Sequence, residues 1–394
     1  MRILMLGWEL PPHNSGGLGV ACYHLAESLA KKGANISFVL PYDADHDVDF
    51  MEVVPATTLG PAAMKFGSYD SRTVDEKGEF GLSMREIQRL YGEFIREYLE
   101  REEVDAVHAH DWLTLEAGVI ARKEYGVPLI AHVHATEFDR AGGGLGNPLI
   151  HEIEREGLMM ADEVLAVSGL TKRIIEERYG IPGDKIRVAH NGFNANDWGV
   201  HDYDPSRYKY LESLRRQGRT IVATTARLTV QKGIGYLIDG FAVARERHPE
   251  MTLVIAGDGE QRDELLRISA EKGVSEDVLF TGFIRGRELR DIYSVCDVFV
   301  MSSCSEPFGL TAFEAAHHDA ALILTRQSGA GEVLHNALKY DYWDTHRLAD
   351  TLYNIASSPG LQRDMRRSIG REYTKLPWDK VADLILNSYW RWAR

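Results

Sequence analysis

Short apolar runs alternate with longer amphipathic stretches along almost the whole chain, and this alternation limits the possible folds more than any other feature of the sequence. Clear examples of the apolar runs are Ile3–Leu6, Leu129–Val133 and Val298–Met301. Nearly continuous apolar runs are typical of strands that are buried on both faces, and the amphipathic stretches between them predict helices. Repeated strand–helix units favour parallel sheets with helices on both faces, so we expect an α/β fold.

The length of the chain predicts two domains. A chain of 394 residues is longer than one hydrophobic core usually supports. The strand–helix pattern is interrupted and then starts again, so we expect one domain over residues 1–200 and a second over residues 201–375. The last segment, residues 376–394, begins near Pro377 and is rich in Trp and Tyr. It predicts a helix that packs back toward the N-terminal domain.

Composition argues against several classes of partner. The formal net charge of −14 disfavours nucleic acid as the main partner and also disfavours docking on anionic lipid. No apolar run reaches the length of a membrane span, and the first residues predict a strand rather than a secretory signal, so we expect no stable membrane insertion. Cys22, Cys296 and Cys304 show no metal-binding spacing, which favours a reducing, cytoplasmic setting.

The stretch Met301–Ala316 combines a strand end, a polar loop and the start of a helix. Glu306 lies in the loop and Glu314 lies one turn into the helix. The helix start supplies backbone amides where the helix dipole favours an anion; these amides belong to Gly309, Leu310 and Thr311. The stretch can therefore hold a charged ligand together with several hydroxyl groups. An ordinary strand–helix connection with two solvated glutamates fits the same pattern.

Further polar residues follow other predicted strands, and such residues gather at the carboxyl ends of parallel strands. In the first half they are Gly16, Gly17, Asp111 and His134, and in the second half Arg227, Lys232 and Gly257. The basic pair suits a diphosphate, the glycines allow close approach of a backbone, and the histidine and carboxylates suit hydroxyl groups. A sugar nucleotide has all of these parts. Simpler readings remain open: a surface lysine at 232, a helix cap at Asp111 and a plain glycine turn at 16–17.

Six motifs in the same order resemble a known family. In the second half S-E-P-F-G-L-T-A-F-E-A resembles the E-x7-E motif of GT-B glycosyltransferases, A-R-L-T-V-Q-K-G their Arg/Lys phosphate clamp, and A-G-D-G-E their G-x-G turn. In the first half G-G-L-G, H-A-H-D-W and H-V-H-A-T-E-F-D-R agree with it. Together they resemble glycosyltransferase family 4, in the branch similar to glycogen and starch synthases. The resemblance implies a GT-B fold, in which the parallel sheets of two Rossmann-like domains face each other across a cleft.

The resemblance also implies a role for each candidate residue. Arg227 and Lys232 would bind the donor diphosphate, while Gly16 and Gly17 would offer amides to it. Glu306 would hold the sugar hydroxyls and Glu314 the ribose hydroxyls. The remaining donor contacts would come from His134 near the sugar 6-hydroxyl, Asp111 near the sugar and acceptor, the turn at Gly257, and the amides of Gly309, Leu310 and Thr311.

The implied activity is a retaining hexosyl transfer from a nucleotide sugar, ADP-glucose or UDP-glucose, to an α-1,4-glucan. A family 4 enzyme that makes another glycan or glycolipid is the alternative, and a non-catalytic sugar-nucleotide binding protein is a remote one. We expect no cofactor and no metal. The D-A-D and D-V-D segments between Asp43 and Asp49 lie in an acidic loop, and the Arg/Lys clamp would make a metal unnecessary.

One position departs from the family pattern. Bacterial glycogen synthases typically have a lysine immediately before the two glycines, whereas Ser15 stands there in this chain. A donor contact would thus be lost or replaced.

Overall fold

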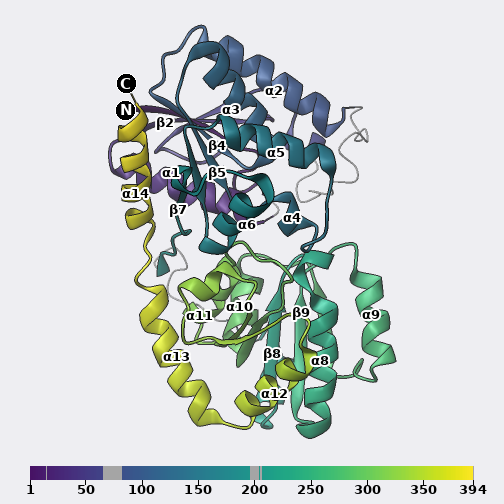
Figure 1. Cartoon of the computed structure of the whole chain (residues 1–394). Helices are drawn as coiled ribbons and strands as arrows, with labels where there is room; N and C mark the ends of the chain where they lie inside the picture. Colours follow the sequence, from purple (N-terminus) through teal and green to yellow (C-terminus); the bar gives the residue numbers. More distant parts are fainter. Residues whose placement is uncertain (15, 65–81, 196–203, 205, 394) are drawn as a thin grey trace. The chain divides into compact units, whose positions relative to one another are not determined.

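The structure is a computed structural model that describes residues 1–14, 16–64, 82–195, 204 and 206–393. The chain forms two compact units. The first unit comprises Met1–Arg140, Gly144–Gly192 and Pro377–Arg394, and the second comprises Ala141–Gly143 and Phe193–Leu376. Each unit contains one parallel sheet with helices packed on it (Figure 1), which confirms the predicted α/β class with two parallel-sheet domains. Ser15, which stands where the family pattern has a lysine, lies outside the described residues.

The first unit is built on a seven-stranded parallel sheet with the order β3-β2-β1-β4-β5-β6-β7. Its central strands are buried at every position because helices cover both faces, and this burial explains the continuous apolar runs. The strands are β1 (Arg2–Leu6), β2 (Asn35–Leu40), β3 (Glu52–Pro55), β4 (Ala106–His110), β5 (Leu129–Val133), β6 (Glu163–Ala166) and β7 (Ile186–Val188).

Local signals set the ends of several helices in this unit. Helix α2 begins after Ser83, whose side chain accepts from the Glu86 amide while the Glu86 carboxylate accepts from the Ser83 amide, a complete capping box. The helices are α1 (Gly17–Lys31), α2 (Met84–Leu99), α3 (Trp112–Tyr125), α4 (Glu137–Arg140), α5 (Pro148–Met160), α6 (Gly169–Tyr179) and α14 (Trp378–Trp392), with short 3-10 turns at Pro61–Ala63 and Gly183–Lys185.

Helix α14 packs within the first unit. It buries one apolar face that includes Trp378, Ile385 and Tyr389. The Tyr389 hydroxyl lies 2.6 Å from Nδ1 of His108 on β4, and Asp383 pairs with Lys32 at 2.6 Å. The C-terminal segment and the central strand of the first unit are therefore joined by a buried polar contact as well as by apolar packing.

The second unit is built on a six-stranded parallel sheet with the order β10-β9-β8-β11-β12-β13. The strands are β8 (Thr220–Thr225), β9 (Met251–Ala256), β10 (Val278–Gly282), β11 (Val298–Met301), β12 (Ala321–Thr325) and β13 (Leu338–Tyr340). The helices are α7 (Lys209–Arg216), α8 (Ile234–Arg247), α9 (Arg262–Glu271), α10 (Arg287–Val295), α11 (Leu310–His317), α12 (Thr345–Ala356) and α13 (Pro359–Tyr373), with 3-10 turns at Val230–Lys232 and Gly329–Glu332.

None of the helices in the described part of the chain combines a sufficient length with sufficient apolar character to cross a bilayer.

Candidate active site

One predicted basic residue and one predicted acidic residue of the second unit meet after β8 and β11. Lys232 follows β8 and Glu306 follows β11, and the Lys232 ammonium lies 2.7 Å from a Glu306 carboxylate oxygen. Ser303 donates a hydrogen bond to the same oxygen at 2.8 Å. Both side chains of the ion pair are mostly buried, with exposures of 16% and 13%. The structure thus brings together a cation and a carboxylate that are far apart in the sequence.

Hydrogen bonds between the two loops fix the position of this pair. The Gln231 side chain donates to the Ser305 carbonyl at 3.0 Å, and the Gln231 carbonyl accepts from the Cys304 amide at 2.8 Å. The Ser302 hydroxyl donates to the carbonyl of Lys232 at 2.9 Å. Because the backbone on both sides is bonded across the loops, the ammonium and the carboxylate are held on rigid segments.

The glycine turn after β9 packs against the loop that carries Arg227. A Cβ at Gly257 would lie only 1.8 Å from the carbonyl oxygen of Ala226, and the Leu228 amide donates to the Asp258 carbonyl at 2.9 Å. Close backbone packing therefore accounts for the glycine at position 257. Arg227 itself is half-buried.

Helix α11 begins at the end of the loop that contains Glu306. Gly309 precedes it with a φ of 98°, and a Cβ there would lie 2.7 Å from the Met301 side chain. Leu310 and Thr311 are the first two residues of the helix, and amides at such positions have no acceptor within the helix. This geometry leaves the start of α11 suited to an anion or to hydroxyl oxygens.

Glu314, one turn into α11, is held by a tyrosine that the sequence analysis missed. The Tyr293 hydroxyl lies 2.7 Å from both the Glu314 carboxylate and the Thr225 hydroxyl. Burial raises the pKa of Glu314 to about 7, although the hydrogen bond from Tyr293 acts in the opposite direction. Since Tyr293 lies on α10 with nothing unusual in its local sequence, only the packing of α10 against β8 and α11 could identify it.

In the first unit, Asp111 anchors the segment that carries His134. Asp111 follows β4 with a φ of 58°, and its carboxylate accepts from the amides of His134 at 2.6 Å and Ala135 at 3.2 Å. It occupies the N-cap position of α3, yet its side chain makes no capping bond there. The carboxylate therefore fixes the backbone after β5 instead of capping the helix.

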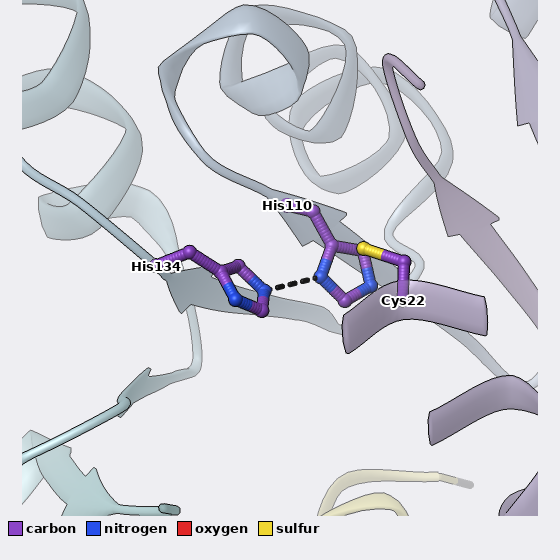
Figure 2. A group of neighbouring side chains, drawn as sticks. All are labelled: Cys22, His110 and His134. Carbon is purple, nitrogen blue, oxygen red and sulfur yellow. Dashed lines mark hydrogen bonds between the residues drawn. The ribbon is translucent and has the colours of Figure 1, made fainter. Parts of the chain in front are cut away.

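Four histidines lie together, two on β4, one on β5 and one just beyond β5. His110 is in register with His132, and alternate residues of a strand point to the same face, so the side chains of His108, His110, His132 and His134 stack on one another. His110 Nδ1 lies 3.0 Å from His134 Nε2, as Figure 2 shows. The H-x-H pattern in both strands was the sequence signal for this cluster.

Burial keeps these imidazoles neutral. It lowers the pKa of His108, His110 and His132 well below the usual value for histidine, and it lowers the pKa of His134 to about 3. His134 is therefore an uncharged hydrogen-bonding group at neutral pH, suited to hydroxyl groups more than to phosphate.

The glycine-rich start of α1 contacts an acidic residue, Glu9, that the sequence did not single out. Gly16 is the extended N-cap of α1, and Gly17 is its exposed first residue. The buried Glu9 carboxylate accepts from the Gly19 amide at 3.2 Å. A Cβ at Gly16 would have no described atom within 4 Å, so packing does not require glycine there.

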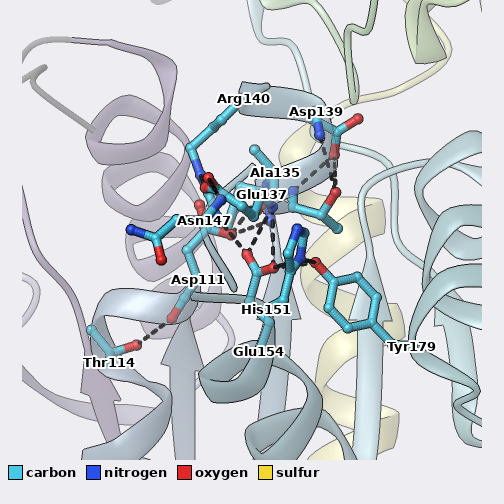
Figure 3. A network of polar contacts seen from close by, with 12 residues as sticks. Asp111, Thr114, Ala135, Glu137, Asp139, Arg140, Asn147, His151, Glu154 and Tyr179 are labelled. Atoms are coloured by element: carbon cyan, nitrogen blue, oxygen red, sulfur yellow. Dashed lines mark hydrogen bonds and ion pairs between the residues drawn. The ribbon is translucent and has the colours of Figure 1, made fainter. Parts of the chain in front are cut away.

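The segment after His134 belongs to a buried ion network, and Figure 3 shows its members Glu137, Arg140 and Glu154. Arg140 on α4 pairs with Glu137 at 3.1 Å and with Glu154 on α5 at 2.5 Å, and it donates to the Ala135 carbonyl at 3.0 Å. Glu154 also accepts from the Glu137 amide and from the Tyr179 hydroxyl. Asp111 and Arg140 therefore hold the segment after His134 from two sides.

The contribution of Asp111 to the free energy of unfolding should depend on pH. Burial raises its pKa to about 6, although Arg140 and two backbone amides oppose the rise. The folded state thus binds more protons than the unfolded state between pH about 4 and 6, so this group contributes stability at low pH that is lost as the pH rises. We expect the free energy of unfolding of the wild type, relative to Asp111→Asn, to fall by about 2 kcal/mol across that window and then stay level. Denaturant unfolding from pH 4 to pH 8 measures this difference, and a difference that does not change with pH would contradict it.

Comparisons with known proteins identify the family of the chain. Residues 15–197 match the family model described as Glycosyltransferase Family 4, and residues 209–369 match the model described as Glycosyl transferases group 1. An uncharacterized glycosyltransferase of Methanocaldococcus jannaschii is 28% identical over 404 residues, covering 99% of this chain and 98% of that protein. A glycogen synthase of Mycobacterium tuberculosis is 28% identical over 407 residues, covering 99% of this chain and 94% of that protein. An Anabaena protein solved in complex with UDP and glucose shares the fold with a TM-score of 0.74 at 20% identity, covering 98% of this chain and 99% of that chain.

Proposed function

The chain belongs to the GT-B glycosyltransferases of family 4, and from this membership we propose that it transfers glucose from a nucleoside diphosphate glucose to an α-1,4-glucan with retention of configuration. The glycogen synthase relative supports glucan as the acceptor. The Anabaena structure, which holds UDP and glucose on the same fold, supports a glucose donor. We place the reaction in the cytoplasm, in keeping with three free cysteines.

The observation that carries the proposal is the pair formed by Lys232 and Glu306 at the ends of β8 and β11. A donor diphosphate would compete with Glu306 for the ammonium, because both are anions. Once the Lys232 ammonium pairs with the phosphate instead, the Glu306 carboxylate becomes available to accept hydrogen bonds from sugar hydroxyls. The same contact would then switch from an internal ion pair to two separate contacts with the donor.

The proposed chemistry follows from these groups. The bond from the anomeric carbon to the diphosphate oxygen breaks, and its electrons remain on the diphosphate. Lys232 and Arg227 stabilise the negative charge that develops there. The acceptor hydroxyl attacks from the same face, and its proton passes to the leaving phosphate. A separate strong base is therefore not needed. Lys232 and Arg227 stabilise the charge on the leaving diphosphate, as a metal ion does in other transferases.

The other candidate residues have supporting roles in this proposal. Glu314 accepts from the ribose hydroxyls, and the first amides of α11 bind the sugar and phosphate oxygens. Neutral His134 accepts or donates a hydrogen bond at the transferred sugar. Asp111 acts on His134 through the backbone, so we assign it as a positioning residue. Gly16 and Gly17 remain proposed phosphate contacts, whereas Gly257 supports the Arg227 loop.

The test is nucleotide release from a panel of donors: ADP-glucose, UDP-glucose, GDP-mannose and UDP-N-acetylglucosamine, each with and without glycogen or maltooligosaccharide. We expect release from a glucose donor that depends on glucan, and a product whose new linkage is α by NMR. Release that ignores glucan would favour the alternative, a family 4 enzyme with another acceptor. Donor binding by calorimetry without release under any condition would favour a non-catalytic binding protein.

A further inference from the structure

Beyond the transfer reaction, we propose that Cys22, His110 and His134 form a binding site for one Zn²⁺ ion. The thiol comes from α1, one imidazole from β4 and the other from the segment after β5 (Figure 2). One potential ligand atom from each residue lies within 4.8 Å of the others. Thiolate and imidazole are the ligands that zinc prefers in proteins.

The spacing of the two imidazoles fits an ion after only a small adjustment. His110 Nδ1 and His134 Nε2 are 3.0 Å apart. Two nitrogen ligands of a tetrahedral zinc ion lie about 3.3 Å apart, given bond lengths of about 2.0–2.1 Å. On binding, the ion would take the place of the hydrogen-bond proton, which would move to the other nitrogen of the ring that carries it, and the Cys22 thiol would release its proton to solvent.

The three side chains are not committed to other polar partners. Within the described part of the chain, His110 Nε2 and His134 Nδ1 are buried without a hydrogen-bond partner. Cys22 is a buried free thiol. In the proposed site these two nitrogens carry the ring protons, so neither imidazole has to give up another hydrogen bond to face the ion. His110 is fully buried and His134 is half-buried.

The site is also held in place before any ion binds. Strands β4 and β5 are paired in register, and Asp111 holds the backbone amide of His134. The neighbouring set of His108, His110 and His132 is less suitable, because both ring nitrogens of His108 already contact Tyr389 and His132. Three protein ligands would leave a fourth position for water, as in open zinc sites.

Such an ion would have a functional consequence, which rests on the proposed role of His134. A coordinated imidazole could not also contact the transferred sugar, so Zn²⁺ would inhibit transfer reversibly. Metal binding itself does not depend on that role and is tested separately.

The experiment is a titration of the chelator-treated full-length protein with Co²⁺, which reports its ligands by absorption. We expect one equivalent to bind with a thiolate-to-cobalt charge-transfer band, and Zn²⁺ to displace it. Cys22→Ser should lose this band and bind at least tenfold more weakly, whereas Cys296→Ser, a matched buried thiol of the second unit, should behave as wild type. Wild-type protein that is folded by circular dichroism yet gives no charge-transfer band would overturn the proposal, whatever the variants do.

A second measurement separates the site from the proposed reaction. Zn²⁺ should inhibit donor turnover by the wild type, and chelator should restore it, while Cys22→Ser should resist inhibition at the same concentration. A cobalt band without inhibition would keep the metal site and count against the role of His134. Equal inhibition of Cys22→Ser and wild type, together with equal cobalt affinity, would exclude Cys22 as a ligand.

Discussion

Replacing Lys232 with alanine should lower the rate of glucosyl transfer by about a hundred- to a thousandfold, the usual cost of removing one group that stabilises charge in the transition state. The structure places this ammonium beside Glu306 on two loops that are bonded to each other, so it is fixed at the end of β8. Its removal takes away a positive charge where the leaving diphosphate gathers negative charge. The rate of nucleotide release with glucan at saturating donor measures the loss.

Two further variants make this result specific. Lys272→Ala removes an exposed ammonium of the same unit that pairs with Asp239, and it should leave the rate within about twofold of wild type because exposed pairs contribute little. Lys232→Arg keeps the charge but changes the geometry and should recover only part of the rate. If Lys232→Ala retained more than a tenth of wild-type activity, the assignment of the clamp would be wrong.

Replacing Arg140 with methionine should lower the free energy of unfolding of the first unit by about 3–5 kcal/mol, since it leaves buried carboxylates without their cation. The exposure of the Arg140 side chain is 8%, and those of Glu137 and Glu154 are 0% and 4%. Burial already raises the pKa of Glu154 to about 7 while Arg140 opposes the rise. Chemical denaturation followed by a probe in the first unit measures the loss.

The same substitution has a characteristic pH dependence. Without Arg140 the pKa of Glu154 should rise further, so the folded variant takes up a proton and part of the cost is relieved in acid. The destabilisation should therefore be smaller at pH 5 than at pH 8. Arg89→Met, which breaks an exposed pair with Glu93, serves as the control and should change the free energy by less than about 1 kcal/mol. A loss below 1 kcal/mol for Arg140→Met at pH 8 would contradict the network described here.

The fold class and the loops that carry the site could be predicted from local patterns. The apolar runs and the helix between Ser83 and Glu102 follow from periodicity and capping, which act over a few residues. Residues at strand ends, such as Lys232 and Glu306, could be expected to gather because parallel strands place their carboxyl ends on one edge. The strand β13 and the contact of Tyr293 with Glu314 could not be predicted in this way, because nothing in their local sequence distinguishes them.

The sequence by itself determined that this chain forms two parallel-sheet α/β units with basic and acidic residues after strands of the second, because burial on both faces and helical periodicity depend on neighbouring residues. Only the tertiary structure decided which polar groups meet. Asp111 turned out to hold the His134 backbone, and Lys232 turned out to pair with Glu306, which is 74 residues away. Such contacts depend on strand order and register, and a single sequence does not specify those at the level of individual atoms.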